Sequence, residues 1–301
     1  MQKISMEEKK QLKGRAILLN RDGEHFSVRV ITEDGTLNAD QLEAVAQAGR
    51  LYGDGRVAFT SRLTVELQNV SYENIEPLCR FLEENGLYTG GTGARIRPIV
   101  ACKGTVCVHG LIDTQGLARE LHQLFYKGWY DVKLPHKFKI AVGGCPNNCV
   151  KPGLNDFGIM GQRVPDYNPE LCRACGKCNV AAKCPMKICA KGEDGKMECR
   201  RELCTNCGKC IDACPFHAVK EVKVGYKVLL GGIWGKRQRH ATALRDVYSR
   251  EEVIRLLTCV LELWKEEGQP GERFGLCLER IGVESFLDKL GQRSGINCVP
   301  A

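Results

Sequence analysis

The sequence lacks the features that mark secreted and membrane-spanning proteins. Its N-terminus, MQKISMEEKKQLKG, is charged and has no apolar signal-peptide core, and no run approaches the roughly 18 apolar residues of a membrane span. Aromatic residues are sparse at 7%, but an apolar fraction of 43% is ample for buried cores in 301 residues. We expect a cytoplasmic protein without a membrane span, formed by one large domain or about two to three smaller ones.

Cysteine, in contrast, is abundant, with 18 residues. Secreted proteins that use so many thiols as disulfides are usually much shorter and carry a signal peptide. Cysteines in a cytoplasmic protein indicate metal binding, most simply iron–sulfur clusters in an anaerobic or well-reduced cell. The net charge of +8 is spread along the chain, so we expect no nucleic-acid partner. The basic side chains suit an anionic cofactor, an anionic substrate or an acidic partner.

The first ninety residues predict a compact unit of strands and helices. Alternating apolar residues indicate a strand at 25–31, and helical spacing follows at 37–53. Two short strands at 56–61 and 63–70 precede a helix at 72–86, which Gly86 ends. The order β-α-β-β-α is that of a ferredoxin-like sandwich, a scaffold with no function of its own.

Two cysteine runs give the strongest signal in the sequence. Each has three cysteines at two-residue gaps and a fourth that precedes proline, as in two-cluster ferredoxins, where the fourth cysteine ligates the other cluster. A zinc module is the alternative, but the duplicated order with Cys-Pro endings favours two 4Fe–4S clusters. The predicted ligands are Cys172, Cys175, Cys178 and Cys214 for one cluster, and Cys204, Cys207, Cys210 and Cys184 for the other.

The segment around these runs has its own composition and reads as a small module inserted at 166–222. A strand-like stretch resumes after it near 226–232. A helix follows, with Ser249 and Glu252 at capping-box spacing, a buried apolar stripe, and Gly268 at its end. The module therefore interrupts a larger α/β domain that closes after it.

Four more cysteines form two wider pairs. Cys102 and Cys107 lie in CKGTVC, and Cys145 and Cys149 lie in CPNNC. A helix near 114–128 and a strand separate the pairs, so only the fold can bring them together. Four thiolates in a reduced cytoplasm are again most simply a 4Fe–4S site, and nearby glycines would let the backbone approach a bulky cofactor.

Around these pairs the sequence resembles the sulfite and nitrite reductase family. The resemblance rests on RPIVAC, on LPHKFK and on a strand that ends in GCPNNC, and it covers roughly residues 20–290. The inserted two-cluster ferredoxin is similar to that of dissimilatory sulfite reductase subunits and of the C subunit of anaerobic sulfite reductase. The resemblance implies an α+β fold in four parts: a ferredoxin-like half-domain at 1–95, a siroheme and 4Fe–4S domain at 96–165, the inserted module at 166–222, and the closing part of the siroheme domain at 223–301.

The resemblance also implies roles for single residues. Cys102, Cys107, Cys145 and Cys149 would ligate a cluster coupled to siroheme, with Cys149 bridging to the siroheme iron. The anion-binding and proton-donating side chains would be Arg29, Arg97, Lys137 and Lys139. Contacts to the siroheme carboxylates would come from Arg62, and further basic contributors are Lys236, Arg237, Arg239 and Arg245.

The implied activity is the six-electron reduction of sulfite to sulfide by siroheme and three 4Fe–4S clusters. Two alternatives stay open. Nitrite, reduced to ammonia, would suit the same basic pocket. CKGTVC has four intervening residues where the family usually has five, which leaves room for an electron-transfer subunit without siroheme. Only one half-domain repeat is present, so we expect a homodimer or a heteromeric complex, together with an electron-donor protein such as a ferredoxin or a reductase subunit.

Overall fold

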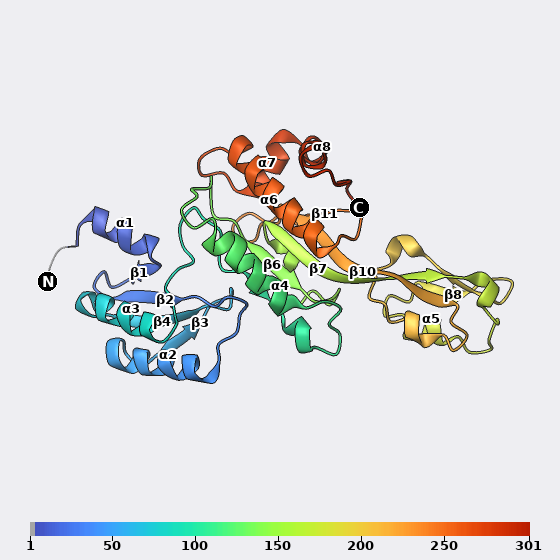
Figure 1. Ribbon diagram of the computed structural model, residues 1–301, viewed down its shortest axis with the longest axis horizontal. Helices are drawn as coiled ribbons and strands as arrows, with labels where there is room; N and C mark the ends of the chain where they lie inside the picture. Colours follow the sequence, from blue (N-terminus) through green and yellow to red (C-terminus); the bar gives the residue numbers. More distant parts are fainter. Residues whose placement is uncertain (1–3) are drawn as a thin grey trace.

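The computed structural model describes residues 4–301, so residues 1–3 of the predicted half-domain at 1–95 lie outside the described part. The N-terminal unit, blue to cyan in Figure 1, is a four-stranded antiparallel sheet in the order β1-β2-β4-β3 with three helices. Its elements are α1 (Met6–Gly14), β1 (Ile17–Leu19), β2 (Phe26–Val30), α2 (Ala39–Tyr52), β3 (Val57–Phe59), β4 (Val65–Val70) and α3 (Ile75–Glu84).

Alternation explains how this sheet buries one face. Phe26, Val28 and Val30 of β2 are buried and join one apolar cluster with Val45 of α2 and Leu78 of α3. The predicted β-α-β-β-α order is confirmed from β2 to α3. The pattern did not reveal α1 and β1, which precede it; β1 adds the strand that completes the sheet.

The central unit is a five-stranded sheet in the order β11-β10-β7-β6-β5. Strands β5, β6 and β7 are parallel, and β10 and β11 run antiparallel to their neighbours. The strands are β5 (Val100–Ala101), β6 (Ile140–Gly143), β7 (Phe157–Tyr167), β10 (Val219–Leu230) and β11 (Thr242–Ala243). The helices are α4 (Thr114–Leu121), which continues as a π-helical turn (His122–Lys127), α6 (Arg250–Glu267), α7 (Phe274–Ile281) and α8 (Val283–Ser294).

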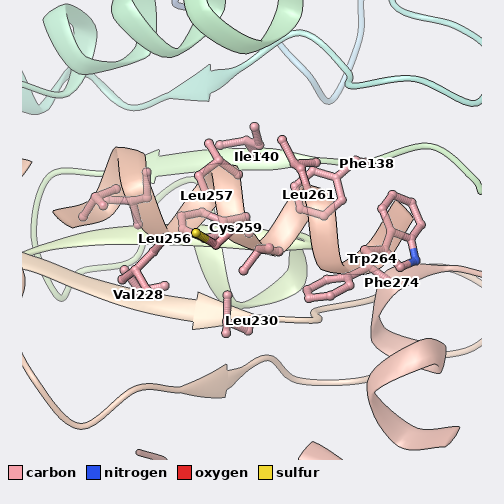
Figure 2. Packing of buried hydrophobic residues seen from close by; sticks show 14 of the residues in the cluster. Phe138, Ile140, Val228, Leu230, Leu256, Leu257, Cys259, Leu261, Trp264 and Phe274 are labelled. Atoms are coloured by element: carbon pink, nitrogen blue, oxygen red, sulfur yellow. The ribbon is translucent and has the colours of Figure 1, made fainter. Parts of the chain in front are cut away.

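The main core lies between this sheet and α6 (Figure 2). All four residues of β6 are buried, as expected for an inner strand of a parallel sheet covered on both faces. Phe138, Trp264 and Phe274 meet with ring centroids 5.3 to 5.9 Å apart. The predicted start and end of α6 are confirmed, because Ser249 and Glu252 form a capping box and Gly268 follows the last turn.

The cysteine-rich module lies between β7 and β10 in the chain. These two strands extend out of the sheet as a long ribbon, and the module forms its far end (Figure 1). It contains α5 (Asn179–Lys183), β8 (Cys189–Lys191), β9 (Met197–Cys199) and a small apolar core of its own. Short 3-10 turns complete the chain at Tyr72–Asn74, Lys103–Val106, Pro152–Leu154, Pro169–Leu171, Arg201–Leu203 and Ile211–Ala213. No helix within residues 4–301 is long and apolar enough to cross a bilayer.

Candidate functional site

The module brings its eight predicted ligand cysteines together in two separate sets. One cavity is lined by Cys172, Cys175, Cys178 and Cys214, and a second by Cys184, Cys204, Cys207 and Cys210. Each set combines three cysteines of one run with the fourth of the other. Burial raises the pKa of Cys210 to about 11, and the neighbouring charges of Cys204, Cys207 and Cys184 add to the effect. The thiols thus lie in two crossed sets, and their role as cluster ligands stays a prediction.

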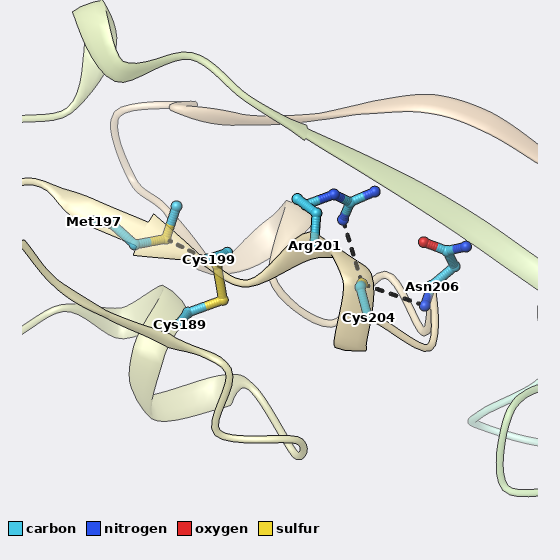
Figure 3. Close-up of a disulfide and its surroundings, with 6 residues drawn as sticks. All are labelled: Cys189, Met197, Cys199, Arg201, Cys204 and Asn206. Carbon is cyan, nitrogen blue, oxygen red and sulfur yellow. Dashed lines mark hydrogen bonds between the residues drawn. A yellow bond between two sulfur atoms is a disulfide. The ribbon is translucent and has the colours of Figure 1, made fainter.

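Hydrogen bonds at Cys204 suit a thiolate that holds a cluster. Arg201 Nη1 donates to its sulfur over 3.3 Å, and the backbone N–H of Asn206 donates over 3.4 Å (Figure 3). Donors to cluster sulfurs stabilise the charge of the cluster and influence its potential. Among the described residues, no group of three His, Cys, Asp or Glu side chains is placed to hold a single metal ion. A cubane instead takes one thiolate at each of four separated iron corners.

Two further cysteines of the module are paired with each other. Cys189 on β8 and Cys199 on β9 face each other across the hairpin and form a disulfide, with a Cα–Cα distance of 4.1 Å (Figure 3). The sequence assigned them no role. Both also border the cavity of Cys184 and Cys204. Their bond closes the hairpin beside that cavity and leaves eight free thiols for the two sets.

The remaining four predicted ligands lie after the carboxyl ends of β5 and β6. The N–H of Gly144 donates to Cys102 Sγ over 3.2 Å, so the loops of the two pairs are in contact. Burial raises the pKa of Cys145, and the charges of Cys102, Cys149 and Cys107 raise it further, which shows that all four thiols are electrostatic neighbours. The four residues of CKGTVC between its cysteines form a tight 3-10 turn.

Glycine permits this close approach of the two loops. A Cβ on Gly144 would lie 2.8 Å from the Cα of Gly104, closer than real Cβ atoms come. The same Cβ would lie 3.4 Å from Cys102 Sγ. These glycines let the two loops pack against each other, and the predicted approach of the backbone to a cofactor stays a prediction.

A second group of side chains lies near the amino ends of the parallel strands, at the opposite end from the cysteines. We call Arg62, Arg97, Lys137, Lys139 and Arg273 the cationic cluster. Burial and the charges of Arg273 and Arg62 together lower the pKa of Lys139 to about 8. Burial likewise lowers the pKa values of Arg62 and Arg97 to about 10, with repulsion from neighbouring guanidinium groups as a further cause. Repulsion between neighbouring cations thus adds to the cost of burial in this cluster.

One carboxylate, Asp156, stands within the cationic cluster. It is fully buried, and Arg273 Nη2 donates to its two oxygens over 3.0 and 2.9 Å. The backbone N–H of Lys139 donates to Oδ2 over 2.9 Å, because Asp156 precedes β7 where Lys139 precedes the parallel strand β6. Neither Asp156 nor Arg273 was among the predicted site residues. The available signal was an aspartate directly before a buried strand, together with the arginine in GERFG.

Other predicted cations are held by protein groups. Arg29 forms an ion pair with Glu66 on the adjacent strand. Arg62 donates to Asn155 Oδ1 and to the carbonyls of Pro98 and Ile140 over 2.6 to 3.0 Å, so it joins the half-domain to the central unit. In the loop between β10 and β11, Lys236 is exposed, Arg237 pairs with Glu279, and Arg239 donates to the carbonyls of Leu230 and Gly231.

The lysines and cysteines of the predicted reaction site lie at opposite ends of β6. Lys139 directly precedes the strand and Cys145 follows it, so six residues of nearly extended chain place their backbones roughly 20 Å apart. Arg97 and Cys102 flank β5 in the same order. Lys139 and Cys145 therefore project from opposite ends of a buried strand, and a single reaction site that uses both stays a prediction.

The structure combines sets of four thiols with a cluster of cations that has few acidic partners. This combination is typical of iron–sulfur oxidoreductases that act on anions. The chain belongs to the nitrite and sulphite reductase family. It matches the nitrite and sulphite reductase 4Fe-4S domain over residues 92–298 and the nitrite/sulfite reductase ferredoxin-like half domain over residues 19–85.

Individual relatives agree with this assignment. The chain is 32% identical over 273 residues to the coenzyme F420-dependent sulfite reductase of Methanocaldococcus jannaschii, covering 89% of this chain but only 42% of that protein. It is 25% identical over 290 residues to the dissimilatory-type sulfite reductase subunit alpha of Allochromatium vinosum, covering 89% and 70%. The crystal structure of dissimilatory sulfite reductase I has the same fold, with a TM-score of 0.71 at 24% identity, covering 91% of this chain and 70% of the other.

Proposed function

We propose that this chain is the catalytic part of a siroheme-dependent reductase that reduces sulfite to sulfide. The observation that carries the proposal is the cationic cluster, in which Arg273 pairs with the buried carboxylate of Asp156 and burial lowers the pKa values of Arg62, Arg97 and Lys139. Within residues 4–301, the Nε atoms of Arg62, Arg97 and Arg273 are buried and have no hydrogen-bond partner. A cofactor with many carboxylates and an oxyanion substrate would neutralise these charges and accept from these donors.

Cluster binding is the second part of the proposal. Cys102, Cys107, Cys145 and Cys149 would hold a 4Fe–4S cluster coupled through Cys149 to siroheme, and the two cysteine sets of the module would hold two more. The convergence of each set of four thiols supports this assignment. When bound, the clusters supply single electrons and siroheme supplies the iron at which sulfite is reduced.

The chain's own residues would manage charge and protons. A lysine with a pKa of about 8, as at Lys139, is still mostly protonated near neutral pH yet gives up its proton readily. Lys137 lies beside it, and burial lowers its pKa in the same direction. Arg97 keeps its charge at all such pH values and would hold the oxyanion in place.

A second subunit would complete the pocket. Because β6 separates Lys139 from Cys145, we propose that the lysines of one subunit face the thiolates of another, in a homodimer or a heteromeric complex. Co-expression of a Lys139→Met chain with a Cys145→Ser chain tests this. Mixed dimers would regain sulfite reduction at one of their two pockets. Mixtures as inactive as either parent would refute the shared pocket.

Anaerobic purification, an absorption spectrum and an iron count test the cofactors. We expect the red-region siroheme band and about thirteen irons per chain, four from each of three clusters and one from siroheme. A count near twelve without that band would instead leave an electron-transfer subunit. Turnover of sulfite and of nitrite with a reduced viologen dye then identifies the substrate, and faster nitrite reduction would overturn our choice. Sulfite is preferred because these sulfite reductases are more similar in sequence to this chain than a nitrite reductase of comparable coverage.

A further inference from the structure

The loop of the CPNNC cysteines and one loop of the module border the same cavity. Cys145, Pro146 and Asn147 line it from the central unit, and Cys207 and Gly208 line it from the module. Cys207 belongs to the set with Cys184, Cys204 and Cys210. A ligand cysteine of the central cluster site thus shares a cavity with a ligand cysteine of this particular module site, which we call the inner site.

Arg163 connects the central unit to the module at this cavity. It lies on β7, and its backbone N–H donates to the carbonyl of Asn206 over 2.8 Å. Its guanidinium donates to Asp212 over 2.6 Å and forms a second ion pair with Glu221, which raises its pKa further. The side chain also lies flat on the module loop, because a Cβ on Gly208 would come within 2.5 Å of its Cδ.

The other module site, with Cys172, Cys175, Cys178 and Cys214, is bordered differently. We call it the outer site. Arg173, Lys177 and Lys191 line its cavity, and no acidic residue does. Lys191 Nζ donates to the carbonyl of Gly176 over 2.8 Å, so part of this basic rim is fixed in position. Such a rim attracts a negatively charged protein surface.

We propose that the module conducts electrons in one fixed order, from an acidic electron-donor protein at the outer site, through the inner site, to the central cluster across the Arg163 contact. This rests on the proposed function, since it requires clusters at all three sites. Each step moves one electron, oxidising one cluster and reducing the next, and no bond forms or breaks. Arg163 is a positioning residue: it keeps the loop of Cys207 against the loop of Cys145.

The contact is tested with Arg163→Gln in the full chain loaded with its cofactors. Iron count and the siroheme band are measured first, so failure of the proposed function is seen separately from failure of this one. Stopped-flow absorbance and freeze-quench EPR then follow siroheme reduction after the module clusters have been reduced. We expect a roughly tenfold slower transfer, the factor that corresponds to about 1.4 kcal/mol, which is the scale of one lost charge-assisted hydrogen bond.

Two further variants make the outcome specific. Arg163→Lys keeps the charge and should recover part of the rate, and Asp212→Asn should slow transfer even if Arg163→Gln loses iron. Arg293→Gln removes an arginine that also faces two carboxylates, Glu262 and Glu266, on the far helices, and serves as control. Transfer at the same rate in Arg163→Gln, Asp212→Asn and the control would overturn the inner-site assignment.

The outer site is tested with two electron donors, an acidic ferredoxin and the small cationic dye methyl viologen. In Arg173→Glu/Lys177→Glu, reduction by the ferredoxin should slow by roughly tenfold or more at low salt and recover the wild-type rate at high salt, because screening removes the repulsion. Reduction by the dye should not slow. Lys265→Glu, an exposed change on α6, is the control. Equal ferredoxin rates in both variants would overturn the outer site as the receiving end.

Discussion

Substitution of Arg273 by methionine should destabilise the fold around the cationic cluster more than the substitution of any exposed arginine. Arg273 donates two hydrogen bonds to Asp156, whose side chain is 0% exposed while that of Arg273 is 12% exposed. Burial by itself raises the pKa of Asp156, and Arg273 is the largest influence that lowers it. Methionine fills much of the same volume but leaves the carboxylate without its guanidinium partner.

The size of the effect follows from what remains around Asp156. Removing one partner of a buried ion pair typically costs about 3–5 kcal/mol. Lys139 still donates its backbone N–H, and its ammonium group and Arg62 still attract the carboxylate. We therefore expect the lower end, about 3 kcal/mol. The double variant Arg273→Met/Asp156→Asn should recover part of the loss, because asparagine leaves no buried charge.

Native-state hydrogen exchange on the loaded protein measures this effect locally. Amides at the start of β7 should lose protection by roughly 100-fold, which corresponds to about 3 kcal/mol of opening free energy. Arg293→Met removes an ion pair between Arg293, which is 33% exposed, and Glu266, which is 57% exposed. It should change the opening free energy by less than about 1 kcal/mol. Equal losses in the two variants would refute the reasoning that burial makes the Asp156 pair strong.

Three other predictions follow from the site and the core. Viologen-driven turnover should fall as pH rises through about 8, where Lys139 loses its proton, and Lys139→Arg should move that fall to higher pH; a pH profile of each tests this. Cys189→Ser should leave the iron count unchanged, whereas Cys204→Ser should lower it by about four, since only Cys204 is a proposed ligand. Trp264→Ala should destabilise α6 by about 3–5 kcal/mol in hydrogen exchange, and the half-exposed Trp234→Ala by far less.

The parts of the site that local spacing determines could be predicted. Three cysteines at two-residue gaps can reach three irons of one cubane, so each run indicates a site, and the fourth cysteine of each run lines the cavity of the other. The limits of α6 follow from Ser249, Glu252 and Gly268, whose contacts are all within one or two helical turns. Both features depend on residues that are near each other in the chain.

The parts that depend on strand order could not be predicted. Lys139 and Cys145 are only six residues apart in the sequence. The buried parallel strand between them places them at opposite ends of the strand. Asp156 and Arg273 are 117 residues apart, and nothing in their local sequence marks them as partners. Cys189 and Cys199 form a disulfide because β8 and β9 form a hairpin, and no alternation of apolar residues in the sequence predicted these two strands.

The cationic cluster also implies a link between cofactor binding and stability. Burial and repulsion between neighbouring cations both disfavour the charged forms of Arg62, Arg97 and Lys139. A protein selected only for stability would replace some of these side chains with apolar ones. Keeping them is reasonable if a polyanion is bound in the working protein, since its binding energy then stabilises the folded chain. The same charges that lower the stability of the chain by itself would thus hold the siroheme and the oxyanion together in the proposed reductase.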